Sequence, residues 1–515
     1  MKHKILLLAF IILSYYTTLI AQGPNNDRQI YSSGVLHTNG TPGFVNYNLE
    51  DEDYVWNKKG QRLFSTGLSG SHFFSASNQD GELKTSGAIY YLTPNDYTFG
   101  ILDTDGTHVA GSQEFYNRVW VIHDYQVKLH QKNATDQTIV FDELPEVFIN
   151  WPAIGNPHID PHFCTSHAEF FDANDDDLYD PVDGDYPLPV DSEGISTSMT
   201  TFYHNNLESS YSNSNLTGIQ YSMVQYILNC QKGDINRTVH TNLMLQSYSP
   251  TTLLDAKFGI FIDHENGCFS DDFMGVDTVT NSVYTYDSDG IDSKPCVSAI
   301  RSVPDTMTAI HTYIFEDDLE SVVPLIRQGP PNASIPVTAD EIYNVLNGQF
   351  KDGTILTQGG TGYDPNNDNP VAIAYPDLPN IANGWSMQNS PGLPENLFGL
   401  VASFSLGDIL PSQKVNLSFK SVNFVWDDTI ALNAFVEYRD RIGALDQDIQ
   451  DYFDSVSACP RVELCEEDCV WPGDSNNNGR VGAEDFIFTN AFNNIQTSGP
   501  ERSVISSEWY GQSAE

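Results

Sequence analysis

Oxygen-bearing side chains between residues 172 and 183 have the spacing of a loop that wraps a hard cation. Counted from Asp172, they stand at positions 1, 3, 5, 9 and 12, and position 7 offers a backbone carbonyl. An EF-hand-type loop orders its ligands this way, and Ca²⁺ takes six to eight oxygens. The alternative is a solvated acidic turn, because Asp177 stands where Gly is usual. The predicted calcium ligands are Asp172, Asn174, Asp176, Leu178 (by its carbonyl), Asp180 and Asp183.

A second segment near the C-terminus repeats this spacing. Gly479 occupies position 6, where the loop must turn sharply, and Val481 at position 8 can pin the loop. A helix is expected to follow over residues 483–492. The Gly makes this signal the stronger of the two, although a plain Asn/Gly loop is the alternative. The predicted ligands are Asp474, Asn476, Asn478, Arg480 (by its carbonyl) and Asp485.

Two further clusters could bind a metal, although for each a simpler explanation is at least as good. His158, His162 and His167 could bind zinc or copper, but in a Pro- and Asp-rich segment exposed or hydrogen-bonded histidines are favoured. A third group of acids follows an expected strand and could form an irregular calcium site or a solvated loop. It consists of Asp263, Glu265, Asp271, Asp272 and Asp277.

The charge balance excludes two classes of partner. The chain has 24 Lys or Arg and 69 Asp or Glu, for a formal net charge of −45. Binding to nucleic acid requires a basic surface, and attachment to anionic lipid requires the same. We therefore expect no nucleic-acid partner. The charge suits a protein that binds cations or works in saline surroundings.

The N-terminus predicts export. A short basic stretch, residues 1–4, precedes an apolar run over residues 5–13, and Ala21 is the expected cleavage position of a signal peptide. The run is too short to span a bilayer comfortably, and no later run approaches about 18 apolar residues. We expect a secreted or outer-surface protein with no membrane span after cleavage. Export permits disulfides among the seven cysteines, with a knot expected at Cys459, Cys465 and Cys469.

The elements that must position these loops are mostly strands. Runs rich in β-branched and aromatic residues alternate with Gly, Pro, Asn and Asp, which predicts antiparallel β-sandwich modules with few helices. Helices are expected over 338–346, with Thr338 as N-cap, and over 432–441 and 445–453. The expected strands are Thr138–Phe141, Met223–Leu228, Thr238–Leu245, Phe258–Ile262, Ser282–Tyr286, Ala309–Phe315, Lys414–Phe419 and Val422–Trp426.

The composition shifts along the chain divide it into modules. After the signal peptide (1–21) come an N-terminal β-rich module (22–150) and the acidic calcium-loop segment (151–190). A central β-sandwich module (191–456) and a Cys-rich linker (457–470) follow. The chain ends in a small loop-helix module (471–515).

The C-terminal module also resembles a known family. The segment from Trp471 through Asp474, Asn476, Asn478 and Gly479 resembles the calcium loop of dockerin-type repeats. That resemblance implies cohesin binding by paired repeats. Only one repeat precedes Glu515, so we expect either continuation of the natural chain or a solitary calcium-stabilised cap.

The wider chain is similar to Bacteroidetes surface proteins that carry a type IX secretion sorting domain. The resemblance is carried by segments 64–68, 151–157, 171–187, 271–277, 342–353 and 469–474. It implies an exported surface protein and transfers no activity. No C-terminal sorting domain is present in this sequence, which again points to a longer natural chain.

The catalytic motifs sought in the sequence are absent: the chain has no GxSxG elbow and no HExxH.

The leading hypothesis is a secreted, calcium-stabilised binding or adhesion protein, with a polysaccharide or another surface protein as partner. The rival is an exported polysaccharide-acting enzyme, or its accessory subunit, with a dockerin-type tail. A passive surface-layer component is a third hypothesis. The 26 Tyr, 28 Phe and 7 Trp could hold sugar rings, although core packing explains them more simply.

Overall fold

A computed structural model gives the architecture of the protein. It describes the backbone of strands 28–31, 35–39, 53–56 and 62–66. It also describes residues 71–88, 96–189, 194–205, 211–228, 230, 233–263, 272–287, 308–326, 333–390, 393, 397–426 and 431–454. The predicted ligands from Asp474 to Asp485, the cysteine trio and the C-terminal module lie outside these residues.

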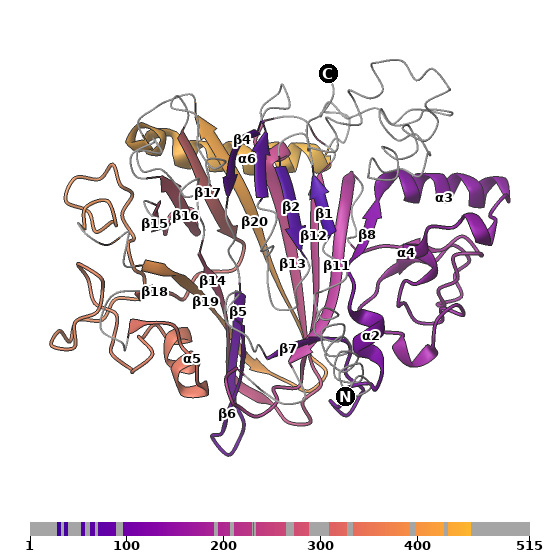
Figure 1. Ribbon diagram of the computed structural model, residues 1–515, viewed down its shortest axis with the longest axis horizontal. Coiled ribbons are helices and arrows are strands. Elements are labelled where there is room, and N and C mark those ends of the chain that lie inside the picture. The colour runs from indigo at the N-terminus through magenta and orange to yellow at the C-terminus, as the bar shows by residue number, and fades with distance from the viewer. Residues whose placement is uncertain are drawn as a thin grey trace, which may run out of the picture.

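The largest element is a nine-stranded antiparallel sheet (Figure 1). Its strands run in the order β15-β16-β17-β20-β13-β12-β11-β7, and β8 also pairs with β11. Their bounds are β7 Tyr97–Phe99, β8 Trp120–His123, β11 Ile195–Asn205, β12 Ile219–Leu228, β13 Thr238–Ser247, β15 Asp272–Asp277, β16 Ser282–Asp287, β17 Thr308–Phe315 and β20 Lys414–Trp426.

A five-stranded antiparallel sheet packs on the first and completes a β-sandwich. Its order is β18-β19-β14-β5-β6. Strands from the predicted 22–150 and 191–456 segments share both sheets, because β14 pairs with β5 and β11 pairs with β7. These two segments therefore build one sandwich. The bounds are β5 Ser71–Ser77, β6 Leu83–Gly87, β14 Leu253–Ile262, β18 Ser321–Ile326 and β19 Leu397–Ile409.

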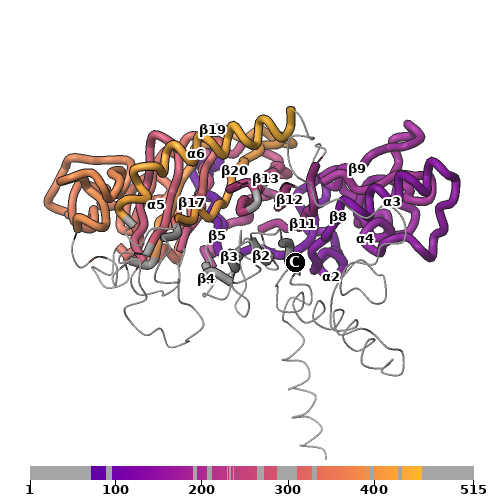
Figure 2. Tube along the Cα trace, turned by 90° about the horizontal axis from the view of Figure 1, so that it is seen from above, coloured from indigo at the N-terminus to yellow at the C-terminus, as the bar shows by residue number. Residues whose placement is uncertain are grey.

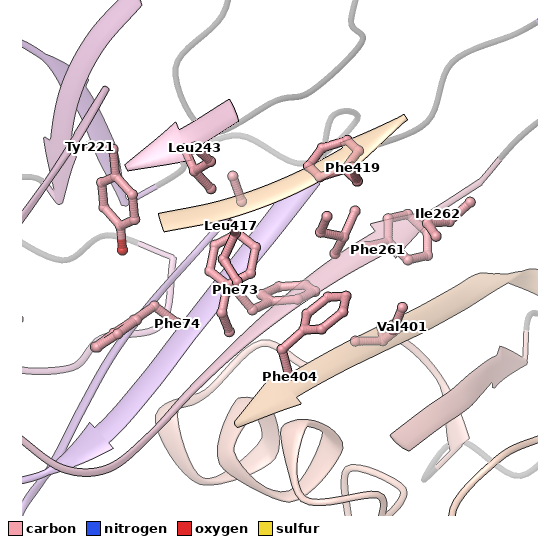
Figure 3. Close-up of a cluster of buried hydrophobic side chains, with 14 of the residues drawn as sticks. Phe73, Phe74, Tyr221, Leu243, Phe261, Ile262, Val401, Phe404, Leu417 and Phe419 are labelled. Atoms are coloured by element: carbon pink, nitrogen blue, oxygen red, sulfur yellow. The ribbon is translucent and has the colours of Figure 1, made fainter. Parts of the chain in front are cut away.

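The core between the sheets is aromatic and aliphatic (Figure 3). Phe404 of the five-stranded sheet lies 5.1 Å, between ring centroids, from Phe315 of the nine-stranded sheet, and Phe315 lies 5.7 Å from Phe419. Phe258 is fully buried beside them. Alternate residues of each strand face the partner sheet, so the two inner faces interdigitate. The predicted β-sandwich class is confirmed.

The outer face of the five-stranded sheet is covered by helix α5 (Ala339–Leu346). Thr338 caps this helix as predicted, since its hydroxyl accepts the Glu341 N–H while the Glu341 side chain accepts the Thr338 N–H. Gly259 permits the close approach of the helix, because a Cβ there would lie 2.3 Å from the Leu346 side chain. A larger residue at 259 would push α5 off the sheet.

Helix α6 (Ala431–Asp454) packs on the outer face of the nine-stranded sheet and crosses several strands near one end (Figures 1 and 2). The two predicted helices, 432–441 and 445–453, are one continuous helix. Phe435 and Tyr438 pack against Tyr284 and Tyr286 of the sheet.

No helix among the residues that the structure describes is long and apolar enough to cross a membrane.

A lobe of residues 101–189 extends from one end of the sandwich, opposite the end that carries α5 (Figures 1 and 2). The lobe contains β8 and short elements joined by turns. Buried Trp120 and Trp151 lie against Phe202 of β11 and attach the lobe to the sheet. Its other elements are α2 Ser112–Tyr116, α3 Asp124–Asp136, η1 Phe141–Glu143, α4 Glu146–Ile149, η2 Pro161–Phe163, β9 Phe170–Phe171 and β10 Tyr186–Pro187.

A four-stranded antiparallel meander precedes the sandwich. Strands β1 (Arg28–Tyr31), β2 (Val35–Asn39), β3 (Asp53–Trp56) and β4 (Arg62–Thr66) pair in chain order. Strand β1 lies against β11 and β12 of the nine-stranded sheet. The meander therefore adds β structure to the same body.

Seven of the eight predicted strands are present, and Lys414–Phe419 and Val422–Trp426 are parts of the single strand β20. The prediction of a strand at Thr138–Phe141 is wrong. Thr138 instead donates its N–H to the Asn133 carbonyl at the end of α3, and the segment continues into η1. Val140 and Phe141 remain exposed, because no neighbouring strand pairs with this segment.

Candidate functional site

The acidic loop is held closed by the short hairpin β9-β10. Phe171 pairs with Tyr186 in register, and the two rings stack at 4.8 Å between centroids with planes 14° apart. Both ends of segment 172–185 therefore meet at one place. The hairpin fixes the loop on the lobe, away from the core of the sandwich.

The carboxylate of Asp172 is the centre around which the loop turns. Its Oδ1 accepts the N–H groups of Asn174 at 3.2 Å and Asp176 at 3.3 Å, and its Oδ2 accepts the N–H of Asp177 at 2.7 Å. Asp175 and Asp177 adopt left-handed φ angles of 58° and 61°, which lets the chain curl this tightly. Desolvation acts to raise the pKa of Asp172, but the N–H groups of residues 174–177 outweigh it and leave the pKa below its ordinary value.

Asn174 and Asp176 continue the same pattern. The Asn174 Oδ1 accepts the Asp176 N–H at 3.2 Å, and the Asp176 Oδ1 accepts the Leu178 N–H at 2.9 Å. The Asn174 amide also donates to the Asp176 Oδ2 at 3.1 Å. The structure thus brings together the first three predicted side-chain ligands and fixes the backbone of Leu178 beside them.

The last two predicted ligands are placed differently. The Asp180 Oδ1 lies 3.1 Å from His158 Nε2 and accepts the Val182 N–H at 2.9 Å. Asp183 is exposed, and its N–H donates to the Asp180 carbonyl. Asp180 therefore joins the loop to His158.

Asp185 is a part of the loop that the sequence did not reveal. Its Oδ1 accepts the Ala173 N–H and its Oδ2 accepts the Asp180 N–H, each at 2.8 Å, so it ties the start of the loop to its end. Burial, together with the nearby carboxylates of Asp172 and Asp176, raises its pKa. Asp185 lies at position 14, outside the 12-residue frame of the loop, so the ligand spacing carries no signal for it.

The donor chemistry of the loop fits Ca²⁺. All the donors are hard oxygens, and the carbonyl of Leu178 would complete the set of Asp172, Asn174 and Asp176. No Lys or Arg occurs between residues 133 and 189, so no side-chain cation within this segment offsets the carboxylates. A calcium ion would supply that charge. Within the described ranges no cluster of three or more His, Cys, Asp or Glu side chains is arranged to hold a metal, so the site would depend on Asn and carbonyl oxygens.

The three neighbouring histidines bind separate partners. His158 pairs with Asp180, His162 Nδ1 lies 2.9 Å from Asp160 Oδ1, and His167 Nε2 lies 2.5 Å from Gln246 Oε1. Burial lowers the pKa of His167 to about 4, so its ring is neutral at physiological pH. Each histidine has its own hydrogen-bond partner, which agrees with the interpretation favoured from the sequence, that of exposed or hydrogen-bonded histidines.

In the third acidic cluster, Asp272 and Asp277 stand at opposite ends of strand β15. Asp277 is fully buried, and its two oxygens accept from Arg439 of α6 at 2.7 and 2.8 Å. It also accepts the Val279 N–H. Asp277 therefore anchors α6 to the sheet. Glu265 and Asp271 lie outside the described residues.

A serine, a histidine and an asparagine form a hydrogen-bonded row on β17 and β20. Ser421 Oγ lies 2.9 Å from His311 Nε2, and His311 Nδ1 lies 2.7 Å from Asn423 Oδ1. This order is that of a nucleophile, a base and an orienting group. All three side chains are at most 5% exposed, so the row satisfies buried polar groups and does not face solvent.

The cysteines that the structure describes are of two kinds. Cys230 is disulfide-bonded. Cys164 is a free, half-buried thiol whose pKa is raised chiefly by burial. Its raised pKa keeps it in the unreactive thiol form at physiological pH.

Comparisons with known proteins do not assign a family. No family model matches the chain, and no curated protein matches it. One matching solved structure carries the name "Putative kojibiose phosphorylase from human microbiome", with 8% sequence identity and a TM-score of 0.27. The match covers 82% of this chain and 33% of that chain, so this chain spans about a third of its length. A TM-score this low carries no argument about fold or activity.

Proposed function

We propose that this protein is a secreted, calcium-stabilised binding or adhesion protein of the cell surface or extracellular space. The observation that carries the proposal is the hydrogen-bonded set of oxygens from Asp172, Asn174 and Asp176 around one turn. The N-terminal segment supports export, and the net charge of −45 supports work in the presence of cations. A polysaccharide or another surface protein is the proposed partner.

Calcium would act on the lobe by ordering the acidic loop. A cation at the turn offsets the repulsion among closely spaced carboxylates and fixes the Leu178 carbonyl. A ligand that binds only the folded state adds about 2.7 kcal/mol of stability when it exceeds its Kd a hundredfold. The second loop, from Asp474 to Asp485, would stabilise the C-terminal module in the same way, which the dockerin-like spacing supports.

The test is a thermal melt of residues 22–515 with calcium and with excess chelator. We expect calcium to raise the melting temperature, and an Asp172→Ala, Asp176→Ala double variant to lose part of that rise. An Asp474→Ala, Asp485→Ala double variant should lose the remainder. A matched control, Asp440→Ala with Asp451→Ala, removes two exposed acids of α6 and should keep the full rise. An equal melting temperature with calcium and with chelator would contradict the proposal.

A further inference from the structure

We propose that an apolar patch beside the acidic loop docks a polypeptide partner whose surface combines apolar side chains with Lys or Arg. This loop patch consists of Phe141, Ile154, Leu178 and Val182, which are 41%, 47%, 50% and 41% exposed. The inference rests on the proposed function, because Leu178 belongs to the loop assigned to calcium. It adds the surface and the chemistry of the partner.

Exposed apolar side chains are concentrated on the lobe. Among the described residues, 15 large hydrophobic side chains are exposed, and seven of them lie between residues 129 and 182. Single exposed hydrophobics are ordinary on soluble proteins, whereas a contiguous patch rimmed by polar groups marks an interaction site. The seven are Leu129, Val140, Phe141, Ile154, Phe171, Leu178 and Val182.

The first half of the loop patch is held together by backbone contacts. The Tyr179 N–H donates to the Ile154 carbonyl at 2.8 Å, which sets Ile154 beside the end of the acidic loop. A Cβ added at Gly155 would lie 2.7 Å from the Leu178 Cβ, so the two chain segments touch there. Ile154 and Leu178 are therefore neighbours on the surface, while the next residue, Tyr179, is buried.

The second half is joined to the first through Asp180. The Phe141 ring lies 4.8 Å, between centroids, from the His158 ring. His158 is hydrogen-bonded to the Asp180 carboxylate, and the same carboxylate oxygen accepts the Val182 N–H. Phe141 and Val182 are thus connected through one polar link, whose carboxylate, Asp180, lies two residues after Leu178.

Calcium would control this surface through Leu178. Its N–H donates to the Asp176 carboxylate, and its carbonyl is the backbone ligand that the loop offers. The cation would therefore fix the backbone that carries the most exposed side chain of the patch. A patch that is already ordered loses less conformational entropy when a partner binds. Docking should therefore be tighter in calcium than in chelator.

Charge complementarity selects the partner. Residues 133–189 contain 13 Asp or Glu and no Lys or Arg, and one divalent cation would offset only two of these charges. A cationic surface is attracted to this field, whereas a second copy of this chain, with a net charge of −45, is repelled, as is an anionic membrane. The apolar patch inside the acidic rim therefore fits a protein surface that is both basic and apolar.

The experiment uses a fluorescent helical peptide with one leucine face and lysines elsewhere, titrated with residues 22–515 at about 0.15 M salt. In calcium we expect a Leu178→Ser, Val182→Ser variant to bind this peptide about tenfold more weakly, a change that corresponds to about 1.4 kcal/mol. The matched control is Val279→Ser with Val436→Ser, two valines that are 71% and 70% exposed outside the lobe. The control should bind as the unchanged protein does.

Three results would overturn the docking surface. Equal affinity of the patch variant and the control variant would show that the patch makes no contact. Equal affinity for a peptide with serines in place of the leucines would show that charge alone is recognised. Binding of a soluble polysaccharide that is lost in Phe171→Ala and kept in the patch variant would assign the lobe to sugars instead.

Melts of the same samples separate this inference from the proposed function. If calcium stabilises every variant but the peptide does not distinguish them, the docking surface fails and the calcium role stands. If calcium stabilises none of them while the patch variant still loses the peptide, the surface stands and its calcium dependence is overturned. If calcium has no effect and the variants bind alike, both proposals fail.

Discussion

The sandwich and the lobe use apolar side chains in opposite ways. In the sandwich, Phe258, Phe404 and Phe419 lie between two sheets and leave almost no surface to water. In the lobe, Ile154 and Leu178 face solvent around a turn of carboxylates. The sandwich is therefore held by apolar burial, which is insensitive to cations, whereas the lobe depends on how its charges are balanced. The proposed function and docking surface place calcium and partner binding in the lobe, and the apolar core places most of the stability in the sandwich.

The largest effect is expected in the core of the sandwich. Phe258→Ala removes a fully buried ring and should lower the free energy of unfolding by about 3–5 kcal/mol. The loss should be equal in calcium and in chelator, because this ring lies between the two sheets and the acidic loop lies on the lobe. Denaturant titrations measure it, with the partly exposed Phe453→Ala as control. A loss that depended on calcium would break the distinction between the two regions.

Gly155→Ala, in the lobe, should produce the next largest loss of unfolding free energy, as measured by denaturant titration. The residue has a φ of 92°, and its added methyl would meet Leu178 at 2.7–2.9 Å. Left-handed backbone costs an L-residue about 1–2 kcal/mol, and the overlap adds about 1–3 kcal/mol. Gly81→Ala is the matched control, because it has a φ of 80° but open space around it. Equal losses at both positions would contradict the contact between Gly155 and Leu178.

A smaller effect distinguishes an acid with a structural role from the proposed calcium ligands. Asp277→Asn weakens the paired bonds to Arg439, which is partly exposed, and should cost about 1–2 kcal/mol. This loss should be the same in calcium and in chelator, as measured by melting. Asp440→Asn on the exposed side of α6 serves as control. Loss of the calcium response in Asp277→Asn would instead place a cation near the third acidic cluster.

The smallest effect is a pH dependence of the lobe. Burial raises the pKa of Asp185 above its unfolded value, so the calcium-free folded state holds a proton more tightly than the unfolded state. In chelator, this residue's contribution to stability should be present at low pH and decline as pH rises through its unfolded and then its folded pKa. Calcium should reverse that slope, because it favours the ionised loop. The measurement is a series of melts from acid to neutral pH, with Asp185→Asn as control, and a slope that calcium left unchanged would contradict the prediction.

The sequence predicted the β-sandwich class because strand patterns are local. Thr238–Leu245 and Ala309–Phe315 are runs with β-branched or aromatic residues, and both form strands as expected. Thr138–Phe141 carries the same kind of pattern but has no strand to pair with, and its apolar side chains joined the exposed surface instead. Pairing between distant segments, such as β5 with β14, is set by tertiary contacts that no local pattern encodes.

The acidic loop was partly predictable for the same reason. The spacing of Asp172, Asn174 and Asp176 is a local property, and the structure brings these side chains together. Asp185 was not predictable, because its role comes from bonds to Ala173 and Asp180 across the hairpin. The exposure of Leu178 also depends on its neighbour Gly155, which is 23 positions away in the sequence.

Hydrogen exchange measured by mass spectrometry tests the difference between the two regions most directly. Residues 22–515 would be compared in calcium and in excess chelator, with the Asp172→Ala, Asp176→Ala variant in parallel. We expect calcium to slow exchange in peptides that cover residues 170–186 and to leave β12, β13 and β20 unchanged. The double variant should lose that protection. Unchanged exchange at 170–186, or equal slowing in the sandwich strands, would contradict the assignment of calcium to the lobe.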